Sequence, residues 1–264
     1  MKKRILLLLC LILITGCYQH NPKVEKDNYT NINYYKEEYQ DRYLQYQTKH
    51  PELSLTDIIT RVNIGLDQPY YTNTKETPFL NQTHILSNKY LYMPETYIPH
   101  NLEKIDPTYT NGTKLLVKEA KENFEQLARD AKNQGYTIRA ISAYRSYDYQ
   151  TILYNKYVDQ DGKEKADTYS ARPGYSEHQT GLVVDVDNGI TTYTKFETTK
   201  EFNWMQENAH KYGFILRYPN GKEEITGYTY ESWHYRYVGK KIAEKIQTQN
   251  ITFDEYYIRY LEKK

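Results

Sequence analysis

The chain has 264 residues, with 35 Lys and Arg against 34 Asp and Glu, which gives a formal net charge of +1. This balance excludes the strongly basic footprint of a nucleic-acid-binding domain, so no nucleic-acid partner is expected. With 26% charged and 39% hydrophobic residues, the composition suits a soluble globular protein with one main domain and an extension.

The N-terminal residues have the pattern of an export signal. A basic start over residues 1–4 precedes an apolar run over residues 5–14, which is too short to span a bilayer. Residues 14–17 read Ile-Thr-Gly-Cys and resemble a bacterial lipoprotein box. We therefore expect a signal peptide over 1–16 and a lipid on Cys17 that anchors an exported protein to the outer face of the bacterial cytoplasmic membrane. An ordinary secretory peptide and an uncleaved anchor are the alternatives.

Only two cysteines occur in the sequence, Cys10 in the apolar run and Cys17 at the expected lipidation site. The mature chain would therefore contain neither a disulfide nor a thiolate metal ligand. An exported protein of this kind must rely on its hydrophobic core or on a metal ion for stability.

The segment after the signal peptide is predicted to be a tether followed by a small extension. Residues 17–50 are polar, and tyrosines at helical spacing predict a helix near 34–46. Residues 51–84 are expected to form an N-terminal extension packed on the main domain. This extension would begin with a short helix that Ser54 or Thr56 caps.

The main domain is predicted over residues 85–264, and its hydrophobic periodicity defines the elements. We expect strands over 85–92, 136–143, 182–186 and 214–218. We expect helices over 111–134, 147–158, 199–212 and 240–248. The connections are predicted to include a loop over 159–175 and an Asn-Gly hairpin turn at 219–222, and the chain is predicted to end in a docked tail over 251–261. Helices and short strands alternate irregularly. The sequence therefore predicts an α+β fold with an antiparallel sheet flanked by helices.

A carboxylate interrupts an apolar run in the second half of the chain. Residues 182–186 read Leu-Val-Val-Asp-Val and predict a buried strand. Asp185 lies inside it, where a carboxylate is costly unless it is paired or binds a metal ion. His178 precedes it, and His234 follows further along the chain. Two histidines and a carboxylate can bind zinc and leave a fourth position open. Two core histidines with a salt-bridged aspartate are the alternative.

The ordered motifs resemble those of a known family. Residues 176–185 read Ser-x-His-x-x-Gly-x-x-x-Asp, and residues 231–234 read Glu-x-Trp-His. This set resembles the zinc D-alanyl-D-alanine carboxypeptidases of the VanY type, a group that also includes L,D-carboxypeptidases and D-alanyl-D-alanine dipeptidases. The resemblance covers roughly residues 85–240 and takes in Ser-Ala-Tyr-Arg-Ser at 142–146 and Ser-Ala-Arg-Pro-Gly at 170–174.

The resemblance implies a Zn²⁺ cofactor with the ligands His178, Asp185 and His234. It implies that Glu231 is the general base, which takes a proton from zinc-bound water and passes it to the leaving amine. Glu231 and His234 would point in opposite directions on a flat strand, so both can reach the metal only if the chain bends near Ser232. A surface glutamate is the alternative for Glu231.

Three further residues correspond to family positions near the substrate. Arg145 would either stabilise the scissile carbonyl as charge develops or bind the free carboxylate of the peptide. Gln150 and Ser176 would bind the substrate, although a helix-face amide and an N-cap serine are equally open readings. Arg172 is a weaker candidate, and Asp187 is expected to be a turn residue rather than a ligand.

Taken with the resemblance, the sequence predicts a zinc metallopeptidase that removes the C-terminal D-alanine from peptidoglycan stem peptides, which is a D,D-carboxypeptidase activity. The expected partners are the stem peptide and, through the N-terminal lipid, the membrane; we expect a monomer. An L,D-carboxypeptidase acting on tetrapeptide stems is the closest alternative. A non-catalytic wall-binding protein on the same fold is the second, and a dipeptidase is disfavoured by the long segment before residue 101.

Overall fold

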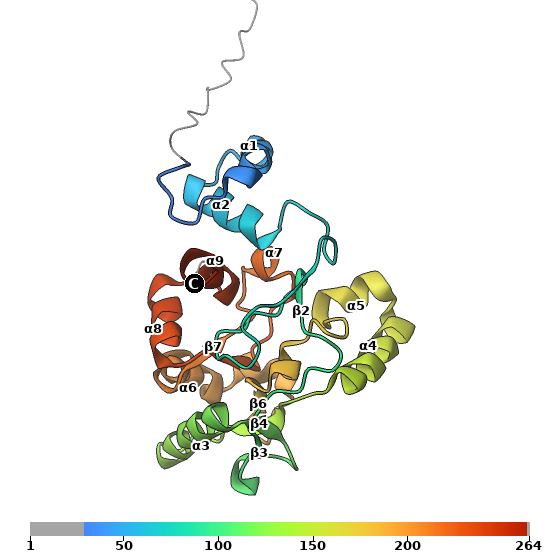
Figure 1. Cartoon of the computed structure of the whole chain (residues 1–264). Helices are drawn as coiled ribbons and strands as arrows, with labels where there is room; N and C mark the ends of the chain where they lie inside the picture. Colours follow the sequence, from blue (N-terminus) through green and yellow to red (C-terminus); the bar gives the residue numbers. More distant parts are fainter. Residues whose placement is uncertain (1–28, 263–264) are drawn as a thin grey trace, which may run out of the picture.

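The computed structural model describes residues 29–262 and shows a small helical unit above a larger mixed domain (Figure 1). The expected signal peptide, the lipidation site Cys17 and the start of the tether lie outside the described residues. Within the described range, no helix combines the length and the apolar character needed to cross a membrane.

The N-terminal unit consists of η2 (Glu37–Tyr39), α1 (Gln40–Lys49) and α2 (Leu55–Ile64), and α1 packs on α2. The Ser54 side chain accepts a hydrogen bond from the Asp57 amide and caps α2, as predicted. Helix α2 also packs against the C-terminal helix α9 (Phe253–Tyr260). The extension therefore contacts the main domain through the last helix of the chain.

A four-stranded antiparallel sheet forms the centre of the main domain. Its strands, in spatial order, are β5 (Arg139–Ser142), β6 (Val183–Asp187), β8 (His234–Tyr237) and β7 (Phe214–Leu216). The two strands that carry the predicted metal ligands, β6 and β8, are thus neighbours in the middle of the sheet. The predicted α+β class with an antiparallel sheet is confirmed.

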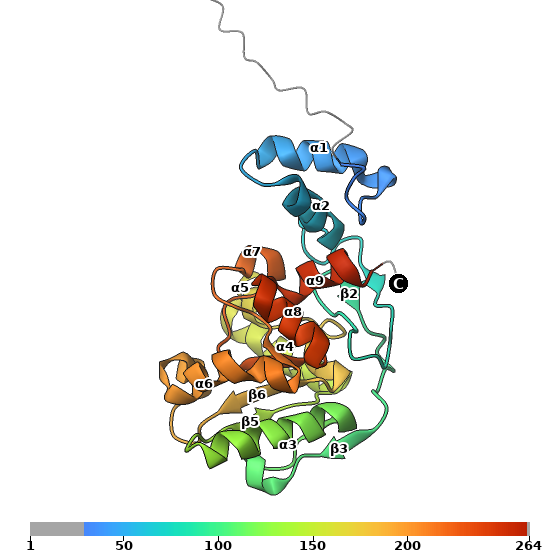
Figure 2. The same ribbon diagram turned by 90° about the vertical axis from the view of Figure 1, so that its left-hand side faces the viewer.

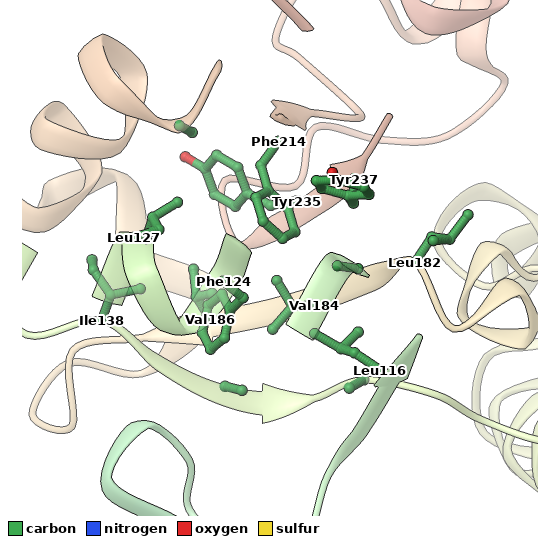
Figure 3. Packing of buried hydrophobic residues seen from close by; sticks show 14 of the residues in the cluster. Leu116, Phe124, Leu127, Ile138, Leu182, Val184, Val186, Phe214, Tyr235 and Tyr237 are labelled. Carbon is green, nitrogen blue, oxygen red and sulfur yellow. The ribbon is translucent and has the colours of Figure 1, made fainter. Parts of the chain in front are cut away.

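The two faces of the central sheet carry different kinds of side chain. Val184 and Val186 of β6 pack with Phe124 and Leu127 of α3 (Lys118–Asn133) in the main hydrophobic core (Figure 3). Because successive strand residues alternate between faces, Asp185 points away from this core. Helices α8 (Lys240–Gln249) and α9 lie on that second side, opposite α3 (Figure 2).

The remaining elements are short and connect or flank these layers. They are β1 (Lys75–Glu76), β2 (Leu91–Tyr92), β3 (Leu102–Lys104), η3 (Pro107–Tyr109), β4 (Leu115–Val117), α4 (Tyr147–Asp161), α5 (Lys163–Tyr169), η4 (Glu177–Thr180), η5 (Tyr193–Thr198), α6 (Lys200–Asn208), η6 (Ala209–Tyr212) and α7 (Glu223–Thr226). The pair β1–β2 is parallel, and β3–β4 is antiparallel.

The strand predicted over 85–92 is wrong, because only Leu91–Tyr92 is extended and paired. The Asn88 side-chain oxygen accepts hydrogen bonds from the backbone amides of Tyr90 and Leu91, which turns the chain. Residues before this turn are buried in irregular structure, so their apolar character reflects burial rather than strand pairing.

Three other boundaries also differ from the sequence prediction. The helix predicted over 111–134 begins only at Lys118, because Leu115–Val117 pairs with β3 instead. The loop predicted over 159–175 contains the helix α5. The Asn-Gly turn at 219–222 leads into α7 rather than closing a tight hairpin, although β7 and β8 do pair.

Candidate active site

The three predicted metal ligands meet on the second face of the sheet. Asp185 of β6 lies directly opposite His234 of β8 in the antiparallel register, and His178 comes from η4 just before β6. One ligand atom from each residue lies within 4.8 Å of the other two, and all three residues are buried. Strand pairing therefore joins two parts of the chain that are far apart in sequence.

A glycine in the first motif allows the chain to pass from His178 into β6. Gly181 ends η4 with a φ of 67°, in the left-handed region that L side chains rarely adopt. A Cβ at this position would lie 2.8 Å from Cδ2 of Leu102, and the Gly181 carbonyl accepts a hydrogen bond from the Val117 amide. Close packing on β3 and β4 and the positive φ together explain the glycine of the motif.

The donor atoms suit a metal ion. His178 Nδ1 lies 2.6 Å from the Ala143 carbonyl oxygen, so Nδ1 carries the proton and Nε2 presents its lone pair to the cluster. Within the described chain, this buried Nε2 and the buried Oδ1 of Asp185 have no hydrogen-bond partner. Buried polar atoms are rarely left unsatisfied, and two imidazole nitrogens with a carboxylate oxygen form a zinc-type donor set. The residues present therefore fit the metal that the sequence predicts.

The charges at this site also favour a cation. Burial lowers the pKa of His178 to about 4, which keeps its imidazole neutral and able to bind a metal. Burial opposes protonation of His234 as well, but the carboxylates of Asp185, Glu177 and Glu231 raise its pKa well above the usual value. The surrounding carboxylates thus stabilise positive charge at this position, which a proton or a metal cation can supply.

Glu231 reaches the same cluster through a bend in the chain. A turn over Ser232 and Trp233 precedes β8, so the bend predicted near Ser232 is present. Oε2 of Glu231 lies 3.3 Å from Nδ1 of His234. Burial raises the pKa of the Glu231 carboxyl above its ordinary value, despite the neighbouring histidine. A buried carboxylate with raised basicity is suited to accept and return a proton.

One cavity of about 600 Å³ brings together the predicted metal ligands, the predicted base and the three predicted substrate residues, but not Arg172. His178, Asp185, Glu231 and His234 line it, together with the predicted substrate residues Arg145, Gln150 and Ser176. This volume lies within the range of small-ligand pockets, about 300–1,000 Å³.

The predicted substrate residues present unused polar atoms. Nε of Arg145 and Oε1 of Gln150 are buried, and neither has a hydrogen-bond partner among residues 29–262. The amide nitrogen of Gln150 is already used, because it donates to the Ala171 carbonyl. Ser176 precedes η4, yet its side chain makes no capping hydrogen bond, so the N-cap reading is not supported. Nε of Arg145 and Oε1 of Gln150 are therefore available to a ligand in the cavity.

The other candidates from the sequence have structural roles. Arg172 forms a two-point ion pair with Asp167, and its guanidinium carbon lies 3.8 Å from the centre of the Tyr71 ring. Asp187 is the last residue of β6 rather than a turn residue, and it pairs with Arg139 of the neighbouring strand. The charge of Arg172 is thus used within the fold.

Sequence reasoning missed Glu177, although it lies beside His178. Its side chain is fully buried and forms ion pairs with Arg217 and Arg236, which are also fully buried. The available signal was the position of the two arginines next to predicted buried residues: Arg217 directly follows β7, and Arg236 lies between Tyr235 and Tyr237 in β8. A buried arginine requires an anionic partner.

An α+β domain with this buried His-Asp-His cluster and an adjacent glutamate in one cavity has the arrangement of a hydrolase. The family profile described as "VanY: D-alanyl-D-alanine carboxypeptidase" matches residues 113–240. The chain is 35% identical over 265 residues to a D-alanyl-D-alanine carboxypeptidase of Enterococcus faecium, and the match covers 97% of this chain and 78% of that protein. The protein therefore belongs to the VanY family of carboxypeptidases.

Two solved structures extend the similarity to the fold. The L,D-carboxypeptidase LdcB aligns with a TM-score of 0.66 at 38% identity, over 71% of this chain and 91% of that one. A mutant of the vancomycin-resistance D,D-pentapeptidase VanY, in complex with Zn(II), aligns with a TM-score of 0.57 at 31% identity, over 66% of this chain and 98% of that one.

Proposed function

We propose that this protein is a zinc-dependent D,D-carboxypeptidase that removes the C-terminal D-alanine from peptidoglycan stem peptides. The observation that carries the proposal is the convergence of His178, Asp185 and His234 with Glu231 in one cavity. The similarity to a VanY protein that binds Zn(II) supports the choice of metal. A zinc ion held by these three residues supplies Lewis acidity toward a water molecule and a peptide carbonyl.

Glu231 carries the proton transfers in this proposal. Its carboxylate accepts a proton from the attacking water and delivers it to the amine of the departing D-alanine. Burial supports this role because it raises the pKa of the carboxyl and makes the ionised form a stronger base. The 3.3 Å separation between Oε2 of Glu231 and Nδ1 of His234 also supports this role, because the proposed acceptor lies beside a proposed ligand.

Arg145 and Gln150 bind and orient the peptide. Arg145 lines the cavity with an unpaired guanidinium nitrogen, which suits either the terminal carboxylate or the developing oxyanion of the scissile carbonyl. The free Oε1 of Gln150 can accept a hydrogen bond from a peptide N–H. The Ser176 hydroxyl, in the same cavity, is a third contact.

An L,D-carboxypeptidase is the second candidate, because LdcB has the same fold at 38% identity. The test is to offer the purified protein two stem peptides, a pentapeptide that ends in D-Ala-D-Ala and a tetrapeptide that ends in an L-residue followed by D-alanine. We expect a higher kcat/KM for D-alanine release from the pentapeptide. Preference for the tetrapeptide would establish the L,D activity instead, and release of the D-Ala-D-Ala dipeptide would indicate a dipeptidase. Peptide binding without cleavage would indicate a wall-binding protein.

We also propose that a lipid on Cys17 holds the enzyme at the outer face of the cytoplasmic membrane, on the basis of the lipobox-like residues 14–17. The Cys17→Ser variant is expected to leave the membrane fraction while a soluble fragment from residue 18 onward keeps its activity. The measurement is membrane fractionation of the full-length variant. If the variant stays in the membrane fraction, an uncleaved apolar anchor is the better explanation.

A further inference from the structure

Glu177 directs its two carboxylate oxygens to different partners. Oε1 lies 2.8 Å from Nε of Arg217 and 2.9 Å from a terminal nitrogen of Arg236, and both arginines donate hydrogen bonds to it. Oε2 is buried without a hydrogen-bond partner in the described chain, and it lies 3.6 Å from Nε2 of His234. Nε2 of His234 is likewise buried and unpartnered there.

The orientation of the His234 ring determines which nitrogen needs that partner. Nδ1 faces the ligand cluster, at 3.3 Å from Oδ1 of Asp185 and 3.3 Å from Oε2 of Glu231. A neutral imidazole that presents Nδ1 as its lone-pair donor carries its proton on Nε2. That N–H points toward Glu177 and requires an acceptor, because water has little access to a side chain that is only 5% exposed.

We propose that Glu177 is a positioning residue whose carboxylate accepts the Nε2–H of His234 and fixes the imidazole so that Nδ1 faces the metal. This inference rests on the zinc site of the proposed function. A carboxylate behind a metal-binding histidine sets the tautomer and the ring orientation and makes the imidazole a better ligand. Glu177 contributes no atom to the His178, Asp185 and His234 cluster itself.

A buried network of charges holds Glu177 in place. Arg217 also donates to Asp254 of α9 at 2.6 Å, and Asp254 in turn accepts a hydrogen bond from Asn88 at 2.9 Å. Arg236 also donates from Nε and from its other terminal nitrogen to backbone carbonyls, including that of Ile85 at 2.6 Å. Two arginines therefore balance two carboxylates, and the C-terminal helix α9 supports the residue that orients His234.

A glutamine at position 177 cannot replace the glutamate in this network. If its oxygen faces the arginines, its NH₂ group meets the Nε2–H of His234, so that two donors oppose each other. If its oxygen faces His234, the NH₂ group meets the N–H groups of Arg217 and Arg236. Glu177→Gln is thus a nearly isosteric change that breaks the network in either orientation of the amide.

The first experiment measures the zinc affinity of purified Glu177→Gln by competition with a chromophoric chelator. We expect an affinity about 10- to 100-fold below that of the unaltered protein, and an altered visible absorption spectrum of the Co²⁺-substituted variant. Asp67→Asn is the matched control, because Asp67 accepts two hydrogen bonds from Arg42 in the N-terminal unit, away from the metal cluster. This control should leave both the affinity and the spectrum unchanged. An unchanged affinity and spectrum in Glu177→Gln would overturn the inference.

The second experiment uses the unaltered protein and does not depend on how well a variant folds. In the zinc-bound protein, ¹⁵N-labelled histidine should show that His234 binds the metal through Nδ1 and carries a protected proton on Nε2. Zinc bound through Nε2 would contradict the role of Glu177, because no proton would then face its carboxylate. If the unaltered protein binds no zinc at all, the proposed function fails, which is a different result from zinc binding that is indifferent to Glu177.

Discussion

The Glu231→Gln protein is expected to lose about 10²- to 10⁴-fold in turnover while it still binds zinc. Glutamine preserves the size of the side chain and can hydrogen-bond within the cavity, but it cannot accept the proton of the attacking water. Glu231 lies beside His234, and the ligand set His178, Asp185 and His234 is complete without it. Its loss should therefore affect kcat far more than metal content.

The measurement for this variant combines D-alanine release with zinc content of the same sample. Asp187→Asn is a suitable control, because this acid lies on the same strand as Asp185 but pairs with Arg139. A zinc-free Glu231→Gln protein would make Glu231 a metal ligand. A fully active one would remove Glu231 from the mechanism.

The His234→Ala protein is expected to lose its zinc first and its activity as a consequence. The substitution deletes one of the three proposed ligands, and with the zinc it removes the positive charge that faces the carboxylates of Asp185 and Glu231. Buried carboxylates without a compensating charge are costly, so the metal-free variant should also unfold at lower denaturant concentration.

Zinc content after dialysis and a urea unfolding curve test the His234→Ala prediction. His100→Ala is the control, because the side chain of His100 is exposed at the surface and should affect neither quantity. Retention of zinc at the level of the unaltered protein would exclude His234 from the ligand set.

Local signals in the sequence were sufficient to predict many of the elements. The helices that begin near Ser146 and Thr199 are capped by those side chains, which accept hydrogen bonds from the amides of Tyr149 and Phe202. Such contacts join residues three apart, so they can be read from a short stretch of sequence. The apolar residues around Asp185 likewise predicted a buried strand, and Val183, Val184 and Val186 of β6 are buried.

Contacts between distant segments explain what the sequence did not predict. Most of the strand expected over 85–92 is absent, because Ile85 and Leu86 are buried without strand pairing, which only the tertiary structure determines. Glu177 was missed for a related reason. Its partner Arg217 directly follows β7, and its partner Arg236 lies in β8. Both are far from Glu177 in the sequence, so the spacing of residues within a motif does not predict these contacts. The convergence of His178, Asp185 and His234 was predictable because the two motifs resemble those of a known family.

The most direct test of the central claim is D-alanine release by a single preparation before chelation, after chelation and after addition of zinc. The proposed site predicts about one zinc ion per chain in the active protein, no release of D-alanine from a pentapeptide stem once the metal is removed, and recovery when zinc is restored. Undiminished release by the zinc-free protein would contradict a catalytic role for the metal site. A zinc-loaded protein that releases D-alanine from neither the pentapeptide nor the tetrapeptide would contradict the carboxypeptidase function.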